Sequence, residues 1–260
     1  MEIRGKVGVI TGGGSGIGRA VSERLAHDGA AIVVADLDAA GGAETVKRIE
    51  AAGGKAAFIR ADVTKLDDAR KMFELAVSKF GRLDILHNNA GIGTGTPGYP
   101  DAPPERWHLV IEIDLQAVVL GTGLAAPIMQ KQGGGVIINT ASMAGLYPHR
   151  QDAVYGAAKG GVVNFTHSLA HWSAERNIRV NCVCPGIVDT PLVRRGLEAA
   201  TRAGVKSWMP SKIIQPEEIA DAVALLVRDD SLFGCTLEVR PTGRQIVDPR
   251  PAPGSKQRTN

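Results

Sequence analysis

Short runs of apolar, often β-branched residues alternate along the chain with longer stretches in which apolar residues recur at helical spacing. The short runs predict strands at Val7–Ile10, Ala31–Ala35, Ala56–Arg60, Ile85–His87, Val136–Asn139, Arg179–Val183 and Thr236–Val239. The longer stretches predict helices at Gly16–His27, Ala39–Ala52, Lys65–Phe80, Pro104–Gln130, Ala153–Glu175 and Pro216–Val227. Because consecutive parallel strands need an intervening crossover element, the alternation predicts parallel pairing.

Uninterrupted apolar strands such as 136–138 suit a sheet that is covered on both faces. The predicted fold class is therefore α/β, a single-domain Rossmann-type doubly wound parallel sheet with helices on both faces. No internal repeat or linker divides the sequence, so residues 1–248 are expected to form one domain. Residues 249–260 lack apolar periodicity and are expected to be a loose basic C-terminal tail.

The charge distribution argues against a nucleic-acid-binding role. The 260 residues include 30 basic and 27 acidic ones, giving a formal net charge of +3. Arg250, Lys256 and Arg258 of the tail carry this excess, so the rest of the chain is electrically balanced. Because nucleic-acid binders present a concentrated basic patch, we expect no nucleic-acid partner.

Cysteine usage and hydropathy favour a reduced, cytoplasmic protein. Three cysteines are too few for a disulfide scaffold, and Cys182 and Cys184 share one face of a predicted strand, where they are interpreted as buried apolar side chains. No run reaches the ~18 apolar residues of a membrane span, and residues 1–10 lack a signal-peptide pattern. The histidines show no metal-ligand spacing. We therefore expect neither a membrane nor a metal partner.

A glycine-rich turn follows the first predicted strand. Residues 11–18 read Thr-Gly-Gly-Gly-Ser-Gly-Ile-Gly and lead into a predicted helix. Glycines allow a sharp turn close to a ligand, and a helix N-terminus presents unpaired N–H groups to a diphosphate. Glycine-rich turns also occur in ordinary loops, but strand, turn and helix in this order predict a dinucleotide site. The candidate binding residues of the turn are Gly12, Ser15, Gly16, Ile17 and Gly18.

Asp36 ends the second predicted strand, 18 residues after Gly18, near the ~20 expected of a ribose-binding acid. A carboxylate there accepts hydrogen bonds from both ribose hydroxyls and repels a 2′-phosphate. No Lys or Arg immediately flanks Asp36 to offset that repulsion. The sequence therefore predicts NAD as the cofactor, in preference to NADP; the alternative is a surface Asp that caps the next helix.

Ser142, Tyr155 and Lys159 form the candidate catalytic group. Tyr155 and Lys159 are four residues apart on a predicted helix and so share a face, while Ser142 follows a predicted strand. An unperturbed tyrosine has a pKa of about 10, but an adjacent ammonium and a positive nicotinamide favour the phenolate. Tyr155 can then exchange a proton with a substrate oxygen to which Ser142 hydrogen bonds. A Tyr–Lys pair at this spacing lies more often on the surface of a helix than in an active site. The glycine turn and Asp36 in the same sequence favour the active-site interpretation.

Taken together, these motifs resemble the short-chain dehydrogenase/reductase family over about residues 4–240. The residues that carry the resemblance are Thr11–Gly18, Asp62-Val63, Asn88-Asn89-Ala90-Gly91, Ser142, Tyr155 with Lys159, and Pro185-Gly186 with Thr190. A finer resemblance, to the subgroup containing 15-hydroxyprostaglandin dehydrogenase, rests on residues 120–122, 133–137 and 240–243.

The resemblance implies further roles within an NAD-binding catalytic domain. Tyr155 would be the acid/base, Lys159 would bind the nicotinamide ribose, and Ser142 would contact the substrate oxygen. Helices at 104–130 and 153–175 would build a homotetramer or homodimer. The implied cofactor contacts are Asp62 and Val63 near the adenine, Asn89, Ala90 and Gly91 along the cleft, and Pro185, Gly186, Val188 and Thr190 at the nicotinamide end.

Asp114 departs from the family pattern, which usually has Asn at this point in the helix after Trp107. In the family this Asn helps a proton relay from the lysine to solvent. An ionised Asp accepts but cannot donate hydrogen bonds, and its charge favours a protonated Lys159 while opposing a Tyr155 phenolate. We therefore expect Asp114 to take part in catalysis and to alter its pH dependence without abolishing it.

The sequence says least about the substrate pocket. Segments 92–95, 146–150 and 190–210 are expected to build it, and their apolar character predicts a hydrophobic secondary alcohol or ketone. The candidate substrate contacts, besides Ser142 and Tyr155, are Ile92, Leu146, Asp152, Leu192 and Trp208.

Three functions are compatible with these residues. The one the motifs favour is an NAD-dependent oxidoreductase that interconverts a secondary alcohol and a ketone. The second is an NADPH-linked carbonyl reductase, against which Asp36 argues. The third is a non-catalytic redox sensor that binds NAD(H), which Asp114 favours and the intact Ser142, Tyr155 and Lys159 oppose.

Overall fold

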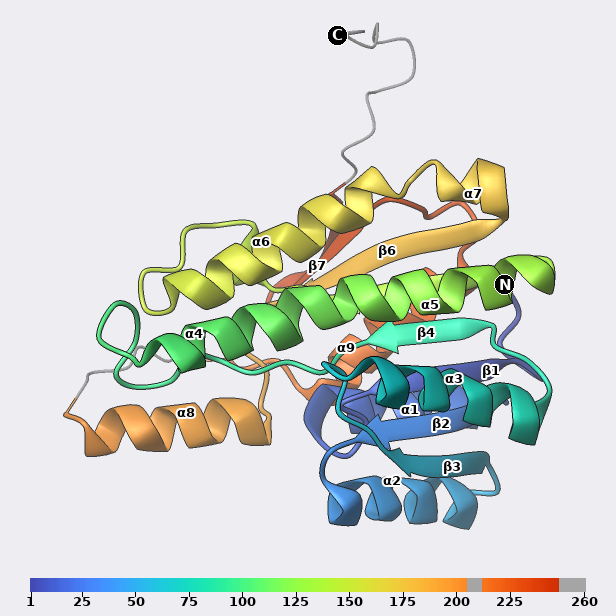
Figure 1. The fold of residues 1–260 in the computed structure, drawn as a ribbon, viewed down its shortest axis with the longest axis horizontal. Helices are drawn as coiled ribbons and strands as arrows, with labels where there is room; N and C mark the ends of the chain where they lie inside the picture. Colours follow the sequence, from blue (N-terminus) through green and yellow to red (C-terminus); the bar gives the residue numbers. More distant parts are fainter. Residues whose placement is uncertain (205–211, 248–260) are drawn as a thin grey trace, which may run out of the picture.

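Eight strands form one sheet in the order β3-β2-β1-β4-β5-β6-β7-β8 (Figure 1). The computed structural model describes residues 1–204 and 212–247. The strands are β1 (Val7–Thr11), β2 (Ala31–Asp36), β3 (Lys55–Arg60), β4 (Ile85–Asn88), β5 (Gly135–Thr140), β6 (Ile178–Pro185), β7 (Thr236–Arg240) and β8 (Gly243–Val247). Strands β1 to β7 pair in parallel, and β8 pairs antiparallel with β7.

Helices cover both faces of the sheet (Figure 1). They are α1 (Gly16–His27), α2 (Ala39–Ala51), α3 (Leu66–Phe80), α4 (Pro104–Ile111), α5 (Ala117–Lys131), α6 (Ala153–Ser168), α7 (Trp172–Arg176), α8 (Pro191–Arg202) and α9 (Pro216–Arg228). On one face, Leu25 of α1 and Val223 of α9 belong to one buried cluster. On the other, Phe73 of α3 and Met129 of α5 belong to a second, and Val162 of α6 to a third. The doubly wound α/β prediction is confirmed.

The long helix predicted over 104–130 contains a change of helical type. Between α4 and α5 the chain forms one π-helical turn, Glu112–Gln116, and the helix then continues to Lys131. Apolar spacing did not reveal this turn, because an i→i+5 hydrogen bond changes the spacing of side chains only locally. Its consequence is that Asp114, in the middle of the turn, points into the protein and is fully buried.

Three further elements differ from the sequence prediction. The helix expected over 153–175 is divided into α6 and α7, where Leu169 and Trp172 pack against the sheet face. Helix α8 was not predicted, since none of its residues is buried. The edge strand β8 was also missed, because its residues are almost all exposed and polar.

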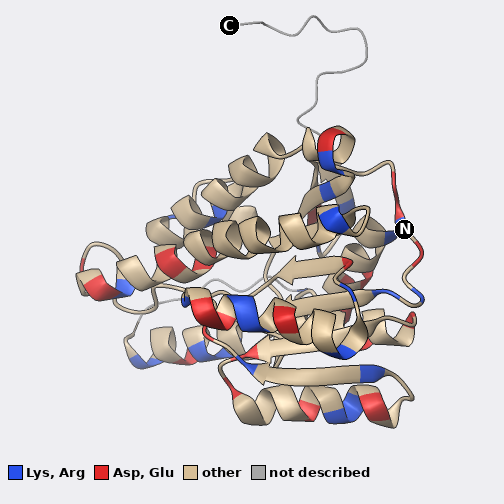
Figure 2. Ribbon diagram, turned by 45° about the vertical axis from the view of Figure 1, so that its right-hand side comes forward, with Lys and Arg blue, Asp and Glu red and all other residues tan. Residues whose placement is uncertain are grey.

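One helical stretch, 104–131, is long and apolar enough by length and composition to cross a membrane, which the count of consecutive apolar residues did not anticipate. Within its apolar window 44% is buried inside the fold, and Met129 packs against the sheet. Charged residues are dense on α2 and α3 and sparse on the outer side of α5 and α6 (Figure 2).

Candidate active site

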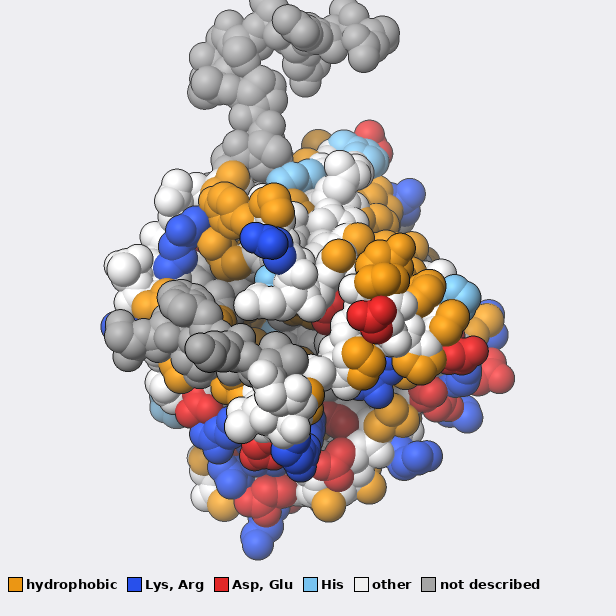
Figure 3. Space-filling view, turned by 90° about the vertical axis from the view of Figure 1, so that its left-hand side faces the viewer, with side chains coloured by type: hydrophobic (Ala, Val, Ile, Leu, Met, Phe, Trp, Pro, Cys, Tyr) orange, Lys and Arg blue, Asp and Glu red, His pale blue; other side chains and the backbone are white. Residues whose placement is uncertain are grey.

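A cleft of about 300 Å³ opens at the carboxyl edge of the sheet. The strand order reverses there, because β1 has β2 on one side and β4 on the other. In open α/β sheets ligands bind at such a switch point. Figure 3 faces this edge and shows a hollow flanked by hydrophobic side chains.

The glycine turn between β1 and α1 forms one wall of the cleft. Gly12 and Gly16 have positive φ angles of 62° and 50°, which glycine adopts without strain. A Cβ on Gly18 would lie 2.1 Å from the carbonyl oxygen of Gly12, so only glycine fits where the turn closes on the helix. Gly12, Ser15, Gly16 and Ile17 line the cleft, and the N-terminus of α1 is therefore presented to it.

Asp36 is held rigidly at the end of β2, facing the glycine turn. Its Oδ2 accepts a hydrogen bond from the Gly14 N–H at 2.8 Å, and its Oδ1 accepts one from the Asp38 N–H at 2.9 Å. A Cβ on Gly14 would come within 2.8 Å of Oδ2, so the turn and the carboxylate are in close contact. Asp36 also lines the cleft. The residues present thus fit an adenosine ribose with free hydroxyls beside Asp36.

Asn89 joins the floor of the cleft to the turn. Its side-chain Nδ2 donates to the carbonyl oxygen of Thr11 at 3.0 Å, and its backbone N–H donates to the Thr11 Oγ1 at 2.9 Å. These bonds fix the end of β4 against the end of β1. Other predicted cofactor residues that line the cleft with it are Asp62, Val63, Ala90, Gly91 and Thr190.

Tyr155 and Lys159 share one face of α6, as the spacing predicted. The Lys159 Nζ lies 5.6 Å from the centre of the Tyr155 ring and donates to the Thr140 carbonyl oxygen at 3.0 Å. Lys159 is only 2% exposed, and both side chains line the cleft. Ser142 follows β5, and its Oγ accepts a hydrogen bond from the Ala144 N–H at 3.1 Å. It lies near enough to the Tyr155 phenol to lower the pKa of that group, but it is not among the residues that line the cleft.

Opposing effects act on the Tyr155 phenol. Burial raises the pKa of Tyr155 and is the largest effect, because it disfavours the phenolate. The Lys159 ammonium and the Ser142 hydrogen bond lower that pKa, whereas the Asp114 carboxylate raises it. The net pKa lies above the usual value for tyrosine. A bound positive charge, or the loss of the Asp114 anion, would move it toward neutrality.

Asp114 lies beneath the Tyr155–Lys159 pair. Its Oδ1 accepts a hydrogen bond from the Ile92 N–H at 2.8 Å, and its Oδ2 is 3.7 Å from the Lys159 Nζ. Oδ2 is buried and has no hydrogen-bond partner among the described residues. Burial raises the pKa of Asp114 above its usual value, although Lys159 opposes that shift. The distance from Oδ2 to Nζ is short enough for the effect of the Asp114 charge on Lys159 that the sequence analysis expected.

The raised pKa of Asp114 predicts how stability changes with pH. An acid that releases its proton less readily when folded destabilises the folded state as pH rises above its unfolded pKa. We therefore expect the free energy of unfolding of Asp114→Asn to rise relative to that of the wild type, by up to about 1.4 kcal/mol per pH unit, as the pH increases from the unfolded pKa of about 4 toward the raised pKa of the folded state. Thermal unfolding of both proteins across this range measures the difference.

The change of this stability difference with pH is the decisive quantity. The variant also loses the ion pair between residue 114 and Lys159, and this loss shifts its stability at every pH without producing the same slope. Asp67→Asn, on the exposed first turn of α3, is a matched control and is expected to follow the wild type. Parallel curves for Asp114→Asn and the wild type would show that Asp114 titrates normally.

His87 is a buried residue near the site that sequence analysis did not identify. Its Nε2 lies 2.8 Å from the Thr140 Oγ1, and that hydroxyl donates to the Asn89 Oδ1 at 3.3 Å. Because the Thr140 hydroxyl donates its proton to Asn89, it must accept a hydrogen bond from the His87 Nε2. The His87 Nδ1 has no partner among the described residues. Burial lowers the pKa of His87 to about 3, so the ring stays neutral and serves to position Thr140 and Asn89.

Several predicted residues lie outside the cleft lining. Gly18 belongs to α1 and Pro185 to β6. The Gly186 N–H donates to the Val239 carbonyl oxygen at 2.9 Å. Val188 is a core residue that forms a β-bridge with Ile214. The structure therefore gives these residues positions that support the fold beside the cleft, and their predicted contacts with a cofactor stay predictions.

Of the predicted substrate contacts, Ile92 and Leu192 line the cleft. Leu146 packs instead against the buried cluster under α5 and α6. Asp152 accepts hydrogen bonds from the N–H and the hydroxyl of Thr94, at 2.7 and 2.6 Å, and caps α6, which gives it a structural role. Trp208 lies outside the described residues. The cleft also includes residues that the sequence analysis did not select: Ala35, Leu37, Ala61, Ile113, Thr140, Pro191 and Arg195.

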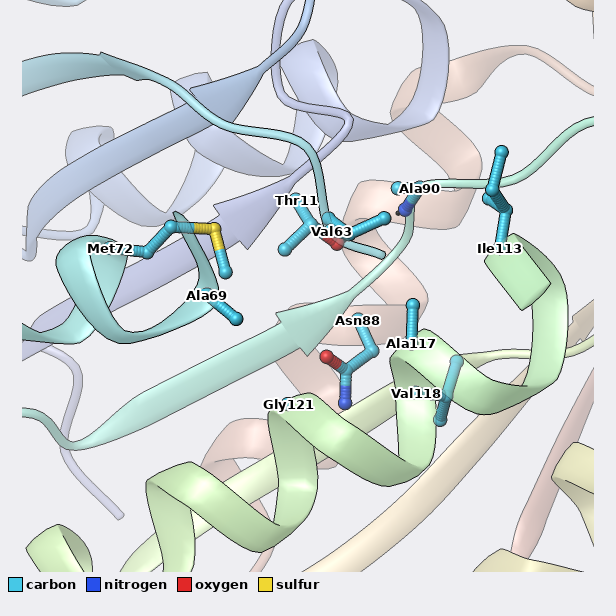
Figure 4. Close-up of a pocket in the computed structure, with 10 residues that line it drawn as sticks. All are labelled: Thr11, Val63, Ala69, Met72, Asn88, Ala90, Ile113, Ala117, Val118 and Gly121. Carbon is cyan, nitrogen blue, oxygen red and sulfur yellow. Dashed lines mark hydrogen bonds between the residues drawn. The ribbon is translucent and has the colours of Figure 1, made fainter. Parts of the chain in front are cut away.

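A second, much smaller cavity of about 10 Å³ adjoins the cleft below Ala90 (Figure 4). In Figure 4 the Asn88 amide lies beside Gly121, and a Cβ at that glycine would come within 2.6 Å of the Asn88 Oδ1. A space of this size holds at most one water molecule. The larger cleft is therefore the candidate site for a dinucleotide and a substrate.

Comparison with known proteins assigns the chain to a family. Residues 6–200 match the model of the short chain dehydrogenases, and the chain belongs to this family. It is 39% identical over 232 residues to cyclohexanol dehydrogenase from Acinetobacter sp. (strain SE19), covering 89% of this chain and 91% of the relative. It is 34% identical over 255 residues to the NAD(+)-dependent 15-hydroxyprostaglandin dehydrogenase of Bos taurus, covering 92% of each.

Among solved structures, levodione reductase superposes with a TM-score of 0.85 at 29% identity, covering 92% of this chain and 97% of that one. The family resemblance that the sequence analysis stated is confirmed, and the 15-hydroxyprostaglandin dehydrogenases are among the relatives, as the finer resemblance predicted. The protein is an oxidoreductase of the short-chain dehydrogenase family whose relatives act on alcohol groups.

Proposed function

We propose that this protein interconverts a secondary alcohol and a ketone with NAD as its cofactor. The observation that carries the proposal is a cleft with Tyr155 and Lys159 at one end, where Ser142 lies near the Tyr155 phenol, and Asp36 at the other. The alcohol activity named for the cyclohexanol dehydrogenase relative supports this reaction class. Ile92 and Leu192 favour a hydrophobic substrate, and the name of that relative favours a cyclic one.

In the proposed reaction, bound NAD supplies the hydride acceptor. The Tyr155 phenolate accepts the hydroxyl proton of the alcohol while the carbinol C–H electron pair leaves as hydride and the C=O bond forms. Ser142 hydrogen bonds to the substrate oxygen and holds it beside the Tyr155 oxygen. Lys159 stabilises the phenolate electrostatically and is fixed by the Thr140 carbonyl. In the reduction direction the same tyrosine returns the proton.

Asp36 supports NAD as the cofactor. A 2′-phosphate beside this carboxylate would meet a negative charge that is held in place by two backbone N–H groups. The cleft-lining cations among the described residues are Lys159, at the opposite end, and Arg195. The NAD(+)-dependent prostaglandin relative is consistent with this choice.

A second copy of the chain is the proposed macromolecular partner. The outer side of α5 and α6 carries few charges (Figure 2), and an open groove of about 430 Å³ there is lined by residues including Leu115, Val119 and Phe165. Val119 is 42% exposed in the single chain. Pairing of this face between copies would give the homodimer or homotetramer that the family resemblance implies. We propose a cytoplasmic location for it.

The electrostatic role of Asp114 predicts a shift in the pH profile. At the alkaline pH where the Tyr155 phenolate forms, Asp114 is ionised and opposes it. Asp114→Asn removes that anion, so the rise of kcat/KM for alcohol oxidation is expected to move to lower pH, by about 0.5–1 unit. A pH–rate profile of both proteins measures the shift. A profile that is unchanged, or moved to higher pH, contradicts this role.

The experiment that tests the proposed function is a panel of secondary alcohols, including cyclohexanols, hydroxy fatty acids and steroids, each followed by NADH absorbance. We expect turnover with at least one cyclic alcohol and a higher kcat/KM with NAD than with NADP. Turnover only with NADP would favour the carbonyl-reductase alternative. Binding of NADH without turnover would favour a redox sensor, for which the raised pKa of Tyr155 and the neighbouring Asp114 are the supporting observations.

A further inference from the structure

Arg195 is a cleft-lining cation that the proposed chemistry does not use. It lies on α8, it is exposed, and it lines the same cleft as the glycine turn. No ion pair or hydrogen bond joins its side chain to another of the residues that the structure describes. Its neighbour Arg194 differs in this respect, because it forms two bonds with Asp189, at 2.7 and 2.8 Å.

The start of α8 contacts the glycine turn directly. A Cβ on Gly16 would lie 3.1 Å from the Thr190 Cγ2 and 3.6 Å from the Pro191 Cδ. Thr190 caps the helix by accepting from the Val193 N–H at 3.3 Å. The first turn of α8 is therefore fixed against the turn at which α1 begins.

Helical geometry directs Arg195 to the same place. Residues four apart share a helix face, so Arg195 lies above Pro191, which touches Gly16. Long side chains in helices also lean toward the helix N-terminus, which for α8 is the end at the glycine turn. Helix geometry therefore directs the Arg195 side chain toward the N-terminus of α1, in keeping with its place in the lining of the cleft.

Few positive charges lie at the N-terminus of α1 to balance a bound diphosphate. The glycine turn, residues 12–18, contains no Lys or Arg, and the guanidinium of Arg19, which follows it, is already bound to the carbonyl oxygens of Gly14 and Gly41. The N-terminus of α1 supplies the equivalent of only about half a positive charge. Lys159 is bound to the Thr140 carbonyl and lies near Asp114, and the other charged lining residues named above are the acids Asp36 and Asp62. A diphosphate carries two negative charges, and a guanidinium binds phosphate oxygens through paired N–H groups.

We propose that Arg195 binds the diphosphate of the dinucleotide, clamping it between α8 and the N-terminus of α1. The inference rests on the proposed function, since it takes a nicotinamide dinucleotide as the occupant of the cleft. The same guanidinium chemistry would suit an anionic group on the substrate, and the experiment below separates the two sources.

The test measures binding without turnover. ADP-ribose, which contains the diphosphate, and adenosine, which does not, are titrated against the full chain by calorimetry. We expect Arg195→Gln to raise the Kd of ADP-ribose about 5- to 20-fold, as for a partly exposed charge-assisted hydrogen bond, and to leave the Kd of adenosine unchanged. The dependence of the ADP-ribose Kd on salt is expected to weaken in the same variant.

Two further variants serve as controls. Arg195→Lys keeps the charge without the paired N–H groups and is expected to fall between the wild type and Arg195→Gln. Arg194→Gln removes a neighbouring charge that is paired with Asp189 and is expected to bind ADP-ribose like the wild type.

The outcomes separate this inference from the proposed function. An ADP-ribose Kd unchanged in Arg195→Gln, or a raised KM for the alcohol alone, overturns the diphosphate role and leaves the proposed function standing. Equal weakening of ADP-ribose and adenosine shows a general distortion of the cleft and also overturns it. Failure of the wild-type chain to bind ADP-ribose overturns both.

Discussion

Replacing Tyr155 with phenylalanine is expected to lower kcat by at least about 10²-fold, and by as much as about 10⁴-fold, because the variant lacks the group that exchanges the substrate proton. The ring keeps its packing on α6, so the Kd of NADH is expected to stay within about twofold of the wild type. Steady-state kinetics and NADH fluorescence titration measure the two quantities.

A matched control for this variant is Tyr147→Phe. Tyr147 belongs to segment 146–150, which the sequence assigned to the substrate pocket, but it does not line the cleft. Its hydroxyl hydrogen bonds to Glu238 and Arg240 instead of the catalytic group. It is expected to retain a kcat close to that of the wild type. If Tyr155→Phe turned over at a near-normal rate, the acid/base assignment would be wrong, whatever the effect of the control.

Removing the carboxylate of Asp36 is expected to change cofactor choice. Asp36→Ala loses hydrogen bonds to the ribose and the repulsion of a 2′-phosphate, so kcat/KM with NAD is expected to fall about 10-fold or more while that with NADP rises or holds. The ratio of the two values for each protein is the measurement.

Asp36 also holds the Gly14 N–H, so its effect on the turn must be separated from its charge. Asp36→Asn keeps an oxygen that accepts from Gly14 but removes the negative charge, and it is expected to relax discrimination against NADP as well. Asp38→Ala, which removes the cap of α2 near Asp36, is expected to change discrimination little. A wild-type protein equally efficient with NADP would contradict the role given to Asp36.

The parts of the site that the sequence predicted are those with local geometry. The glycine turn is recognisable because strand, turn and helix are contiguous, and Tyr155 and Lys159 because four residues make one helical turn. The fold followed in the same way from alternating apolar runs. Asp114 was selected through the family resemblance, and the structure places it 3.7 Å from Lys159.

The missed features depend on contacts between distant segments. His87 reads as one more residue of a buried strand, and its role appears only once β5 brings Thr140 beside it. Helix α8 buries no residue of its own, so its sequence carries no core pattern, and the position of Arg195 follows from contact between Thr190 and Gly16. The π-helical turn that contains Asp114 could likewise be recognised only from the backbone of the structure, because the spacing of apolar residues does not indicate it.

The central claim is that this chain transfers a hydride from a secondary alcohol to NAD through the Tyr155 site. The most direct measurement uses cyclohexanol deuterated at the carbinol carbon, with mass analysis of the cofactor after incubation with the wild type and with Tyr155→Phe. The account predicts that the wild type forms NADH that carries deuterium. It also predicts that the variant forms deuterated NADH at least about 10²-fold more slowly. Wild-type protein that binds NADH but transfers no deuterium from this alcohol or from any other deuterated secondary alcohol would contradict it.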